Sequence, residues 1–358
     1  MRAILALEDG TVFEGRSLGA PGRAYGEVVF NTGMTGYQEI LTDPSYAGQI
    51  VCLTYPLVGN YGINDEDFES RRVQVEGFAV RRAEEAPSNW RAGKTLDAFL
   101  RERGVVAIEG IDTRMLTREL RVRGVMMGGI STDESSSELL ERIRSSPGYS
   151  GIDFARRVTT EEPYTWPFQG QPKHRVALLD CGVKYNIMRS LAALGCQATV
   201  YPCTAPPEQI LEGRPDGILL SPGPGDPKEL GYVVETVRRL VGKAPIMGVC
   251  LGNQILACAF GSRTFKLRFG HRGSNHPVKD LASGRVYITS QNHGYAVDGA
   301  QLKDGMEVAH VNLNDGTVEG LRHRELPIFS IQYHPEASPG PTDSAYFFRQ
   351  FVELMERT

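Results

Sequence analysis

The sequence predicts an α/β protein in which a doubly wound, mostly parallel sheet forms the C-terminal part, after a separate and smaller N-terminal α/β domain. Beyond His174, short apolar runs alternate with segments of helical spacing. Before it, residues 131–171 are polar and irregular, with Pro, Gly and aromatic residues in the stretch PYTWPFQGQPK. A chain of 358 residues also exceeds one ordinary core. We therefore predict domains over residues 1–150 and 173–358, joined by a linker over 151–172.

The N-terminal domain opens with a predicted hairpin. Two short apolar runs, AILAL and TVFEG, flank Asp9-Gly10, a dipeptide typical of hairpin turns. A helix is predicted over residues 112–123, with Asp112 or Thr113 as its cap. Its arginines line one face, which favours a solvated surface over a partner-binding one.

In the C-terminal domain the elements alternate. Buried strands are predicted at RVALLD (175–180), QATVYPC (197–203) and DGILL (216–220). Helices are predicted between them, at YNIMRSLAALG (185–195) and PEQILEG (207–213). Ligands of such sheets bind beyond the carboxyl ends of the strands, so we expect the functional residues there.

Charge and composition exclude several classes of function. Lys and Arg number 39 against 43 Asp and Glu, a net charge of −4, which does not favour nucleic acid as a partner. No apolar stretch approaches the roughly 20 residues that a membrane crossing requires, and the N-terminus does not form a secretory signal. The six cysteines form no CxxC pair, so we expect reduced thiols in the cytoplasm and neither a zinc site nor disulfides.

The sharpest motif is GVCLG at residues 248–252. A strand over 245–249 and a helix over 251–260 predict that Cys250 stands alone at a tight strand-to-helix turn, between Gly248 and Gly252. This is the cysteine form of a nucleophile elbow, where the flanking residues must be small. A thiol at a helix N-terminus is also favoured in its nucleophilic, ionised form. The alternative is that Cys250 is a small buried apolar side chain, as most free cysteines are.

A second strand favours the catalytic interpretation. Residues 326–333 are predicted to form a strand that ends in His334-Pro335-Glu336. In extended chain, His334 and Glu336 face the same way, so the carboxylate can orient the imidazole toward Cys250. The sequence therefore predicts nucleophile, base and orienting acid in the order Cys250, His334, Glu336.

The third candidate feature is the loop SPGPGDP at residues 221–227, after the predicted strand 217–220. Its bare backbone N–H groups suit an oxyanion hole, although an ordinary tight turn is an equal alternative. It is not a phosphate loop, and no nucleotide-binding motif occurs in the chain.

The remaining histidines give weaker signals. His293, in QNHGY after a predicted strand over 286–289, either lines the same crevice or is structural. His271 and His276 show no acidic or thiol residue at ligand spacing, so no metal site is predicted.

Together these motifs resemble those of class I glutamine amidotransferases, and specifically the small, glutamine-hydrolysing subunits of carbamoyl-phosphate synthetases. The resemblance to the class rests on the motifs GVCLGNQ, GPGDP and HPE. The resemblance to the narrower family rests on FGHRGSNHPV, SQNHGYAV and HPEASPGP. The N-terminal half adds GEVVFNTGMTGYQEILTDPSYAGQIV, LTYPLVGNYG and DTRMLTRELR. The resemblance covers essentially the whole chain.

The resemblance implies a mechanism and a set of site residues. Cys250 would attack the carboxamide of L-glutamine to form a γ-glutamyl thioester, His334 would transfer protons, and Glu336 would hold His334. The backbone amides of Gly225 and Leu251 would stabilise the oxyanion. The residues that would contact glutamine are Ser45, Gly223, Gly225, Leu251, Gln254, Asn292, Gly294 and Tyr295. Because Ser45 lies in the N-terminal domain, both domains are expected to close the active site, and that domain is also expected to contribute to the partner interface.

The resemblance also implies a partner. A large subunit would use ATP, Mg and bicarbonate and receive the ammonia through a tunnel, making carbamoyl phosphate for arginine and pyrimidine biosynthesis. This chain would itself need no cofactor. Asn253 and Pro222 depart from the family pattern, which commonly has His and frequently Asn at these positions. Two other functions remain open: a stand-alone cysteine γ-glutamyl hydrolase, and a non-catalytic regulatory subunit.

Overall fold

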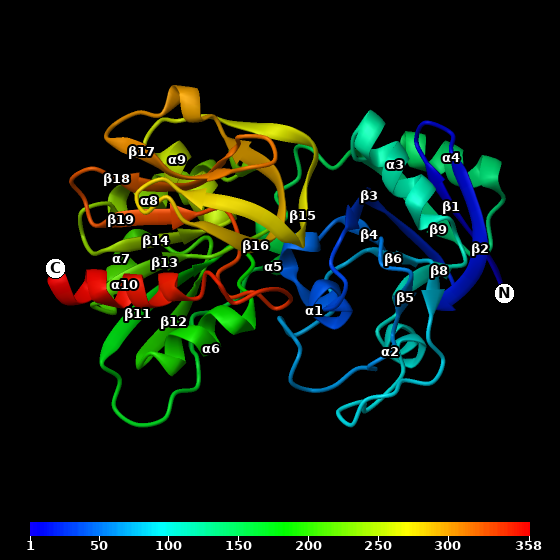
Figure 1. Ribbon diagram of the computed structural model, residues 1–358, viewed down its shortest axis with the longest axis horizontal. Helices are drawn as coiled ribbons and strands as arrows, with labels where there is room; N and C mark the ends of the chain where they lie inside the picture. Colours follow the sequence, from blue (N-terminus) through cyan, green and yellow to red (C-terminus); the bar gives the residue numbers. More distant parts are fainter. The chain divides into compact units, whose positions relative to one another are not determined.

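A computed structural model describes all residues, 1–358, and divides them into two compact units, Met1–Gly151 and Ile152–Thr358. Figure 1 shows both, coloured along the chain. Residues 151–172, for which the sequence suggests a linker, carry structure of their own. They include α5 (Ala155–Val158) and β10 (Tyr164–Thr165), and β10 pairs with β12 (Cys196–Pro202) of the second unit.

The first unit is built on a closed barrel of seven strands in the order β1-β2-β8-β6-β4-β3-β9. The predicted hairpin is confirmed: β1 (Arg2–Leu7) and β2 (Val12–Gly19) are antiparallel and turn at Gly10, whose φ is 97°. The other barrel strands are β3 (Arg23–Asn31), β4 (Gln49–Leu53), β6 (Gly77–Val80), β8 (Val106–Glu109) and β9 (Met126–Ser131). A short parallel pair, β5 (Leu57–Val58) and β7 (Arg82–Ala83), lies outside the barrel sheet.

Helices cover this barrel. The predicted helix is α3 (Thr113–Arg123), and the side chain of Asp112 caps it by accepting a hydrogen bond from the N–H of Met115. Helix α4 (Ser136–Ser145) packs Leu139 and Ile143 against Ile4 of β1. The remaining helical segments are α1 (Tyr37–Thr42), η1 (Pro44–Tyr46) and α2 (Leu96–Glu102).

The second unit contains a sheet of ten strands, in the order β10-β12-β11-β13-β14-β19-β18-β17-β15-β16. The five strands from β12 to β19 run parallel, as predicted, and antiparallel strands extend the sheet on both sides. Their bounds are β11 (His174–Asp180), β13 (Gly217–Leu220), β14 (Ile246–Val249), β15 (Thr264–Asp280), β16 (Val286–Val297), β17 (Met306–Asn312), β18 (Val318–His323) and β19 (Ile328–Ile331).

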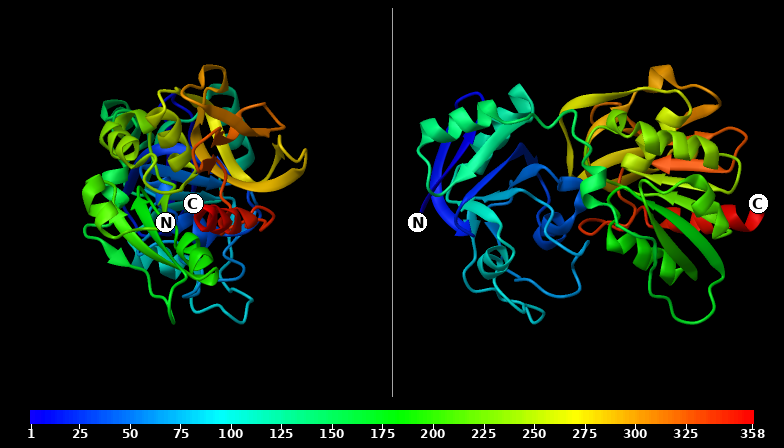
Figure 2. Two further views of the ribbon diagram at one scale, coloured as in Figure 1. Left: turned by 90° about the vertical axis from the view of Figure 1, so that its left-hand side faces the viewer. Right: turned by 180° about the vertical axis from the view of Figure 1, so that it is seen from behind.

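Helices lie on both faces of this sheet, which confirms the doubly wound class (Figures 1 and 2). Alternate residues of each strand serve opposite cores: Ala177 and Leu179 pack with one set of helices, whereas Val176 and Leu178 pack with the other. The first set is α7 (Pro207–Glu212), α8 (Gly231–Leu240) and α9 (Leu251–Ala259); the second is α6 (Tyr185–Ala193) and α10 (Tyr346–Arg357). Two short helical turns, η2 (Pro227–Glu229) and η3 (Gly299–Gln301), complete the unit. No helix combines the length and apolar character that a membrane crossing requires.

Candidate active site

Cys250 occupies the predicted tight turn between β14 and α9. Its φ of 54° and ψ of −105° lie in a region that residues with a Cβ rarely adopt. Both flanking glycines are required by packing: a Cβ on Gly252 would lie 2.3 Å from the carbonyl oxygen of Leu220, and one on Gly248 would lie 2.8 Å from the carbonyl carbon of Gly252. The spacing GxCxG therefore reflects a backbone that only small residues allow.

The parallel pairing of β14 with β19 brings His334 to Cys250. The N–H of Cys250 donates to the carbonyl oxygen of Ile331, the last residue of β19, at 2.8 Å. Burial alone would lower the pKa of His334. The Glu336 carboxylate and the adjacent Cys250 side chain have the larger, opposite effect and raise this pKa to about 10. The imidazole is therefore favoured in its charged form beside the sulfur.

Glu336 orients His334, with 2.6 Å between Nδ1 of the ring and Oε1 of the carboxylate. The contact is the predicted one, but the chain is not extended here. Strand β19 already ends at Ile331, and the N–H of Ala337 closes a turn onto the carbonyl of His334. Burial raises the pKa of Glu336, while Lys184 and His334 lower it to about 2.

Sequence reasoning missed Lys184, which is buried beside Glu336. Its Nζ lies 3.2 Å from Oε1 of Glu336 and donates to the carbonyl oxygen of Ala337 at 2.6 Å. Asn186 holds the same turn by donating to the carbonyl oxygen of Glu336. Lys184 follows the carboxyl end of strand β11. Because ligands of such sheets bind at this edge, its position in the sequence could have identified it as a candidate site residue.

Strand β16 provides the opposite wall of the site. The sequence predicted a strand that ends at residue 289, before Gln291–Tyr295, which is wrong: β16 continues through these residues to Val297. The thiol of Cys250 contacts the carbonyl oxygen of Asn292 at 3.6 Å, and Gln254 donates to the carbonyl of Tyr295 at 2.9 Å. Predicted site residues from α9 and β16 therefore meet.

The glycine loop closes over the start of α9. A Cβ on Gly223 would lie 2.2 Å from the carbonyl oxygen of Cys181 and 2.8 Å from the side chain of Leu251, so the bare backbone is needed for this approach. Gly225 has a φ of 93°. Leu251 is the first residue of α9, and its N–H has no acceptor within the helix. These are the two expected oxyanion donors.

Ser45 belongs to the first unit, where it lies in η1. Its N–H donates to the side chain of Asp43 at 2.9 Å, which fixes the turn. Its hydroxyl is buried and has no hydrogen-bond partner. That a residue of the first unit completes the glutamine site remains a prediction.

Two family models match this chain. Residues 177–354 match the glutamine amidotransferase class-I model, and residues 5–130 match the model for the carbamoyl-phosphate synthase small chain, CPSase domain. The chain belongs to the carbamoyl phosphate synthase small-chain family. It is 52% identical to the small chain of Syntrophotalea carbinolica over 370 aligned residues, which cover 100% of this chain and 98% of that one. It is also 52% identical to the small chains of Clostridium perfringens and Methanopyrus kandleri, with 99% of each chain covered. The predicted family is confirmed.

The two departures from the pattern expected of this family lie in the site region. Asn253 is fully buried; it donates to Gln332 at 3.1 Å and accepts from the hydroxyl of Ser330 at 2.8 Å. It therefore ties α9 to β19. Pro222 follows Ser221, whose hydroxyl accepts from the N–H of Cys181 at 2.8 Å and donates to the carbonyl of Pro222. Both positions support the backbone of the site.

His271 has no acidic residue at ligand spacing in the sequence, but the fold brings two carboxylates to it. Its Nε2 lies 2.8 Å from Oδ2 of Asp315, and its Nδ1 lies 3.3 Å from Oε1 of Glu319. Local spacing did not show this, because both acids come from the turn after β17 and from β18, more than forty residues away. Potential metal-ligand atoms of His271, His293 and Glu319 all lie within 4.8 Å of one another.

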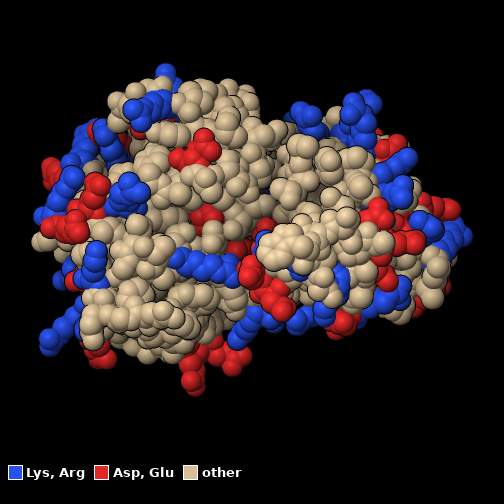
Figure 3. Space-filling view, turned by 60° about the horizontal axis from the view of Figure 1, so that its bottom comes forward, with Lys and Arg blue, Asp and Glu red and all other residues tan.

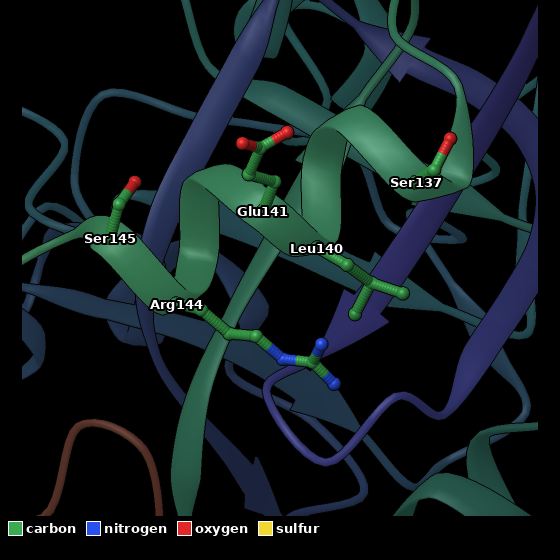
Figure 4. Close-up of a pocket in the computed structure, with 5 residues that line it drawn as sticks. All are labelled: Ser137, Leu140, Glu141, Arg144 and Ser145. Carbon is green, nitrogen blue, oxygen red and sulfur yellow. The ribbon is translucent and has the colours of Figure 1, made fainter.

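Other surface features lie apart from these residues. On the face drawn in Figure 3, acidic and basic side chains are interspersed and do not form a patch of one sign. A pocket along α4 is lined by Leu140, Arg144 and their neighbours Ser137, Glu141 and Ser145 (Figure 4). All but Leu140 are exposed, so this hollow has no buried polar group to recognise a ligand.

Proposed function

We propose that this chain hydrolyses L-glutamine to glutamate and ammonia, with Cys250 as nucleophile. The observation that carries the proposal is the buried row formed by Cys250, His334 and Glu336, with the sulfur at the N-terminus of α9. An imidazole beside a thiol can take its proton, and the thiolate is the reactive form of cysteine.

The first half-reaction forms a thioester. The thiolate of Cys250 adds to the carboxamide carbon, and the N–H groups of Leu251 and Gly225 stabilise the negative oxygen of the tetrahedral intermediate. As the C–N bond breaks, Nε2–H of His334 gives its proton to the departing nitrogen, which leaves as ammonia. Glu336 keeps the ring oriented and stabilises its charged form before the proton leaves.

The second half-reaction returns the enzyme to its starting state. Neutral His334 takes a proton from water, whose oxygen adds to the thioester carbon. Collapse of the second tetrahedral intermediate breaks the C–S bond, releasing glutamate and the Cys250 thiolate beside the imidazolium. Water and glutamine are consumed, and glutamate and ammonia are produced.

We propose that glutamine binds to residues of β16, α9 and the glycine loop, together with Ser45 of the first unit. The residues of the second unit are Asn292, Gly294, Tyr295, Gln254 and Gly223. Support for the residues of the second unit comes from their contacts with one another: backbone groups of β16 contact Cys250 and Gln254, and Gly223 lies against Leu251. The unpartnered, buried hydroxyl of Ser45 is of the kind that a polar substrate satisfies.

We further propose that ammonia passes to a large ATP-dependent chain that makes carbamoyl phosphate from bicarbonate, in the cytoplasm, for arginine and pyrimidine biosynthesis. Free ammonia is mostly protonated at neutral pH and is then not a nucleophile, so direct transfer has a chemical reason. Membership of a family of small chains supports a heteromeric assembly.

The test is glutamate release by the purified chain, alone and with its large chain, with and without ATP and bicarbonate. Strong activation by the large chain and its substrates supports the proposal. Equal activity of the isolated chain favours a stand-alone γ-glutamyl hydrolase, and no turnover even in the complex favours a non-catalytic subunit.

A further inference from the structure

Behind the glutamine-binding segment of β16 lies a buried polar cluster that the proposed mechanism does not use. Its centre is Glu319 of β18, whose side chain is fully buried. The other buried members are His271 of β15, Gln291 and His293 of β16, and Asn312 of β17. Asp315, an exposed residue in the turn between β17 and β18, contacts the cluster from its edge. Burying so many polar groups is unfavourable unless they bond one another, so their arrangement requires an explanation.

The carboxylate of Glu319 receives hydrogen bonds at both oxygens. Asn312 donates its amide N–H to Oε1 at 2.8 Å, and Gln291 donates to Oε2 at 2.9 Å. His271 lies 3.3 Å from Oε1 and bonds Asp315 through its other nitrogen. Burial lowers the pKa of His271, but Glu319 and Asp315 raise it above its ordinary value.

These contacts continue to the substrate-binding backbone. The side-chain oxygen of Gln291 lies 2.9 Å from Nε2 of His293, and Nδ1 of His293 lies 2.8 Å from the carbonyl oxygen of Tyr295. A neutral ring has one N–H to donate to one of these two oxygens. That carbonyl also accepts from Gln254 of α9. A connected path of close polar contacts therefore runs from Glu319, through Gln291 and His293, to a point where β16 meets the helix that begins after Cys250.

A metal ion is the less favoured occupant of this cluster, although two histidines and a glutamate have a suitable spacing. Each of the three side chains already contacts protein groups: Glu319 accepts at both oxygens, His271 bonds Asp315, and the nitrogens of His293 lie against the oxygens of Tyr295 and Gln291. An ion would have to break several of these bonds. These contacts hold the neighbouring strands β15 to β18 together, so the cluster has a structural role without an ion.

We propose that Glu319 is a positioning residue for glutamine recognition, acting through Gln291 and His293 on the backbone of Asn292–Tyr295. This inference rests on the proposed function, because it assigns a role to residues that support the glutamine-binding segment. Glu319 touches neither Cys250 nor its base, so its loss affects the placement of substrate while the nucleophile stays reactive.

The test compares two reagents that modify Cys250. The glutamine analogue 6-diazo-5-oxo-L-norleucine must be recognised before it alkylates the thiol, whereas iodoacetamide requires only an accessible thiolate. In Glu319→Ala we expect the alkylation efficiency of the glutamine analogue to fall about tenfold or more, since a buried group left unpaired is costly. The rate with iodoacetamide should stay within about twofold of the wild-type rate. Glu325→Ala, at an exposed position in the next turn, is the control, and both of its rates should also stay within about twofold of the wild type.

A charge swap separates positioning from simple loss of folding. Gln291→Glu places two carboxylates side by side. Glu319→Gln puts an amide in the place of a carboxylate whose two oxygens both accept hydrogen bonds. Each variant alone should weaken glutamine recognition. The double variant Gln291→Glu with Glu319→Gln restores one carboxylate and one amide in contact. We expect it to recover most of the lost efficiency with the glutamine analogue.

The two proposals fail in different ways. If the analogue does not label Cys250 in the wild-type chain, the proposed function is overturned. If it labels the wild type and Glu319→Ala equally well, the positioning role is wrong. The role is also wrong if both reagents slow equally in Glu319→Ala, or if the charge swap gives no recovery while its melting temperature matches that of the wild type.

Discussion

A buried hydrogen bond of 2.6 Å joins Nδ1 of His334 to Oε1 of Glu336, and Nζ of Lys184 lies 3.2 Å from the same oxygen. The buried row thus extends one member beyond the proposed nucleophile, base and acid. Because none of these side chains is exposed to water, each charge depends on its neighbour. Five predictions follow from the geometry around this row.

Cys250→Ser should reduce glutamate release to background, because a hydroxyl does not ionise as a thiol does and is a far weaker nucleophile. Carbamoyl phosphate synthesis from added ammonium salts by the assembled complex should persist. Cys258→Ser, a thiol on the same helix, is the matched control and should keep both activities. Sustained use of glutamine by Cys250→Ser would contradict the assignment of the nucleophile.

The protonation of His334 gives a pH prediction. Its folded-state pKa of about 10 lies above its ordinary value of 6.5, so the stabilisation from the charged ring is complete below about pH 6.5 and is lost as the pH rises through 10. For Glu336 the pKa is lowered to about 2, so its stabilisation is present above about pH 4.5 and is lost as the pH falls toward 2. Urea unfolding across the pH range should show stability falling above pH 6.5, with a smaller slope in His334→Gln.

Glu336→Gln should lower the pKa of His334, because the carboxylate is the largest influence that favours the charged ring. Nitrogen chemical shifts of the imidazole, followed by NMR against pH, measure this directly. The wild-type ring should stay charged well above neutral pH, and the variant ring should lose its proton at lower pH. An identical titration of the two proteins would show that Glu336 does not govern the base.

Lys184→Met should destabilise the chain by about 3 to 5 kcal/mol, since it removes one of the two cations beside the buried carboxylate of Glu336. Lys243→Met, at an exposed position, should change the free energy of unfolding by less than about 0.5 kcal/mol. Chemical denaturation measures both. Adding Glu336→Gln to Lys184→Met should restore part of the stability, because the uncompensated charge is then gone; additive losses would argue against the pairing.

Gly252→Ala should impair both stability and glutamine hydrolysis, because the new Cβ would lie 2.3 Å from the carbonyl oxygen of Leu220. Relief requires a shift of α9, which displaces Cys250 and the N–H of Leu251; overpacking of this kind costs about 1 to 3 kcal/mol. Gly231→Ala is the control, since a Cβ there meets no atom within 4 Å. Wild-type activity in Gly252→Ala would show that the turn tolerates a larger residue.

The local features of the site were predictable because they lie in short stretches of sequence. GVCLG predicts the turn at Cys250, since only glycines allow its close backbone contacts. The alternation of apolar runs beyond His174 predicts the parallel sheet, and the carboxyl-edge rule brings the residues after β13, β14 and β19 together. The barrel of the first unit was not predicted, because closure depends on pairing between strands far apart in the chain.

Sequence alone determined the family, the doubly wound sheet and the identity of the candidate nucleophile, base and acid, since each is encoded by residues that are neighbours in the chain. Tertiary structure decided that Lys184 supports Glu336 and that Glu319 gathers His271, Gln291 and Asn312 behind β16. Contacts of this second kind depend on strand register across the sheet, and their strength depends on exclusion of water. Neither property can be read from the spacing of residues along the chain.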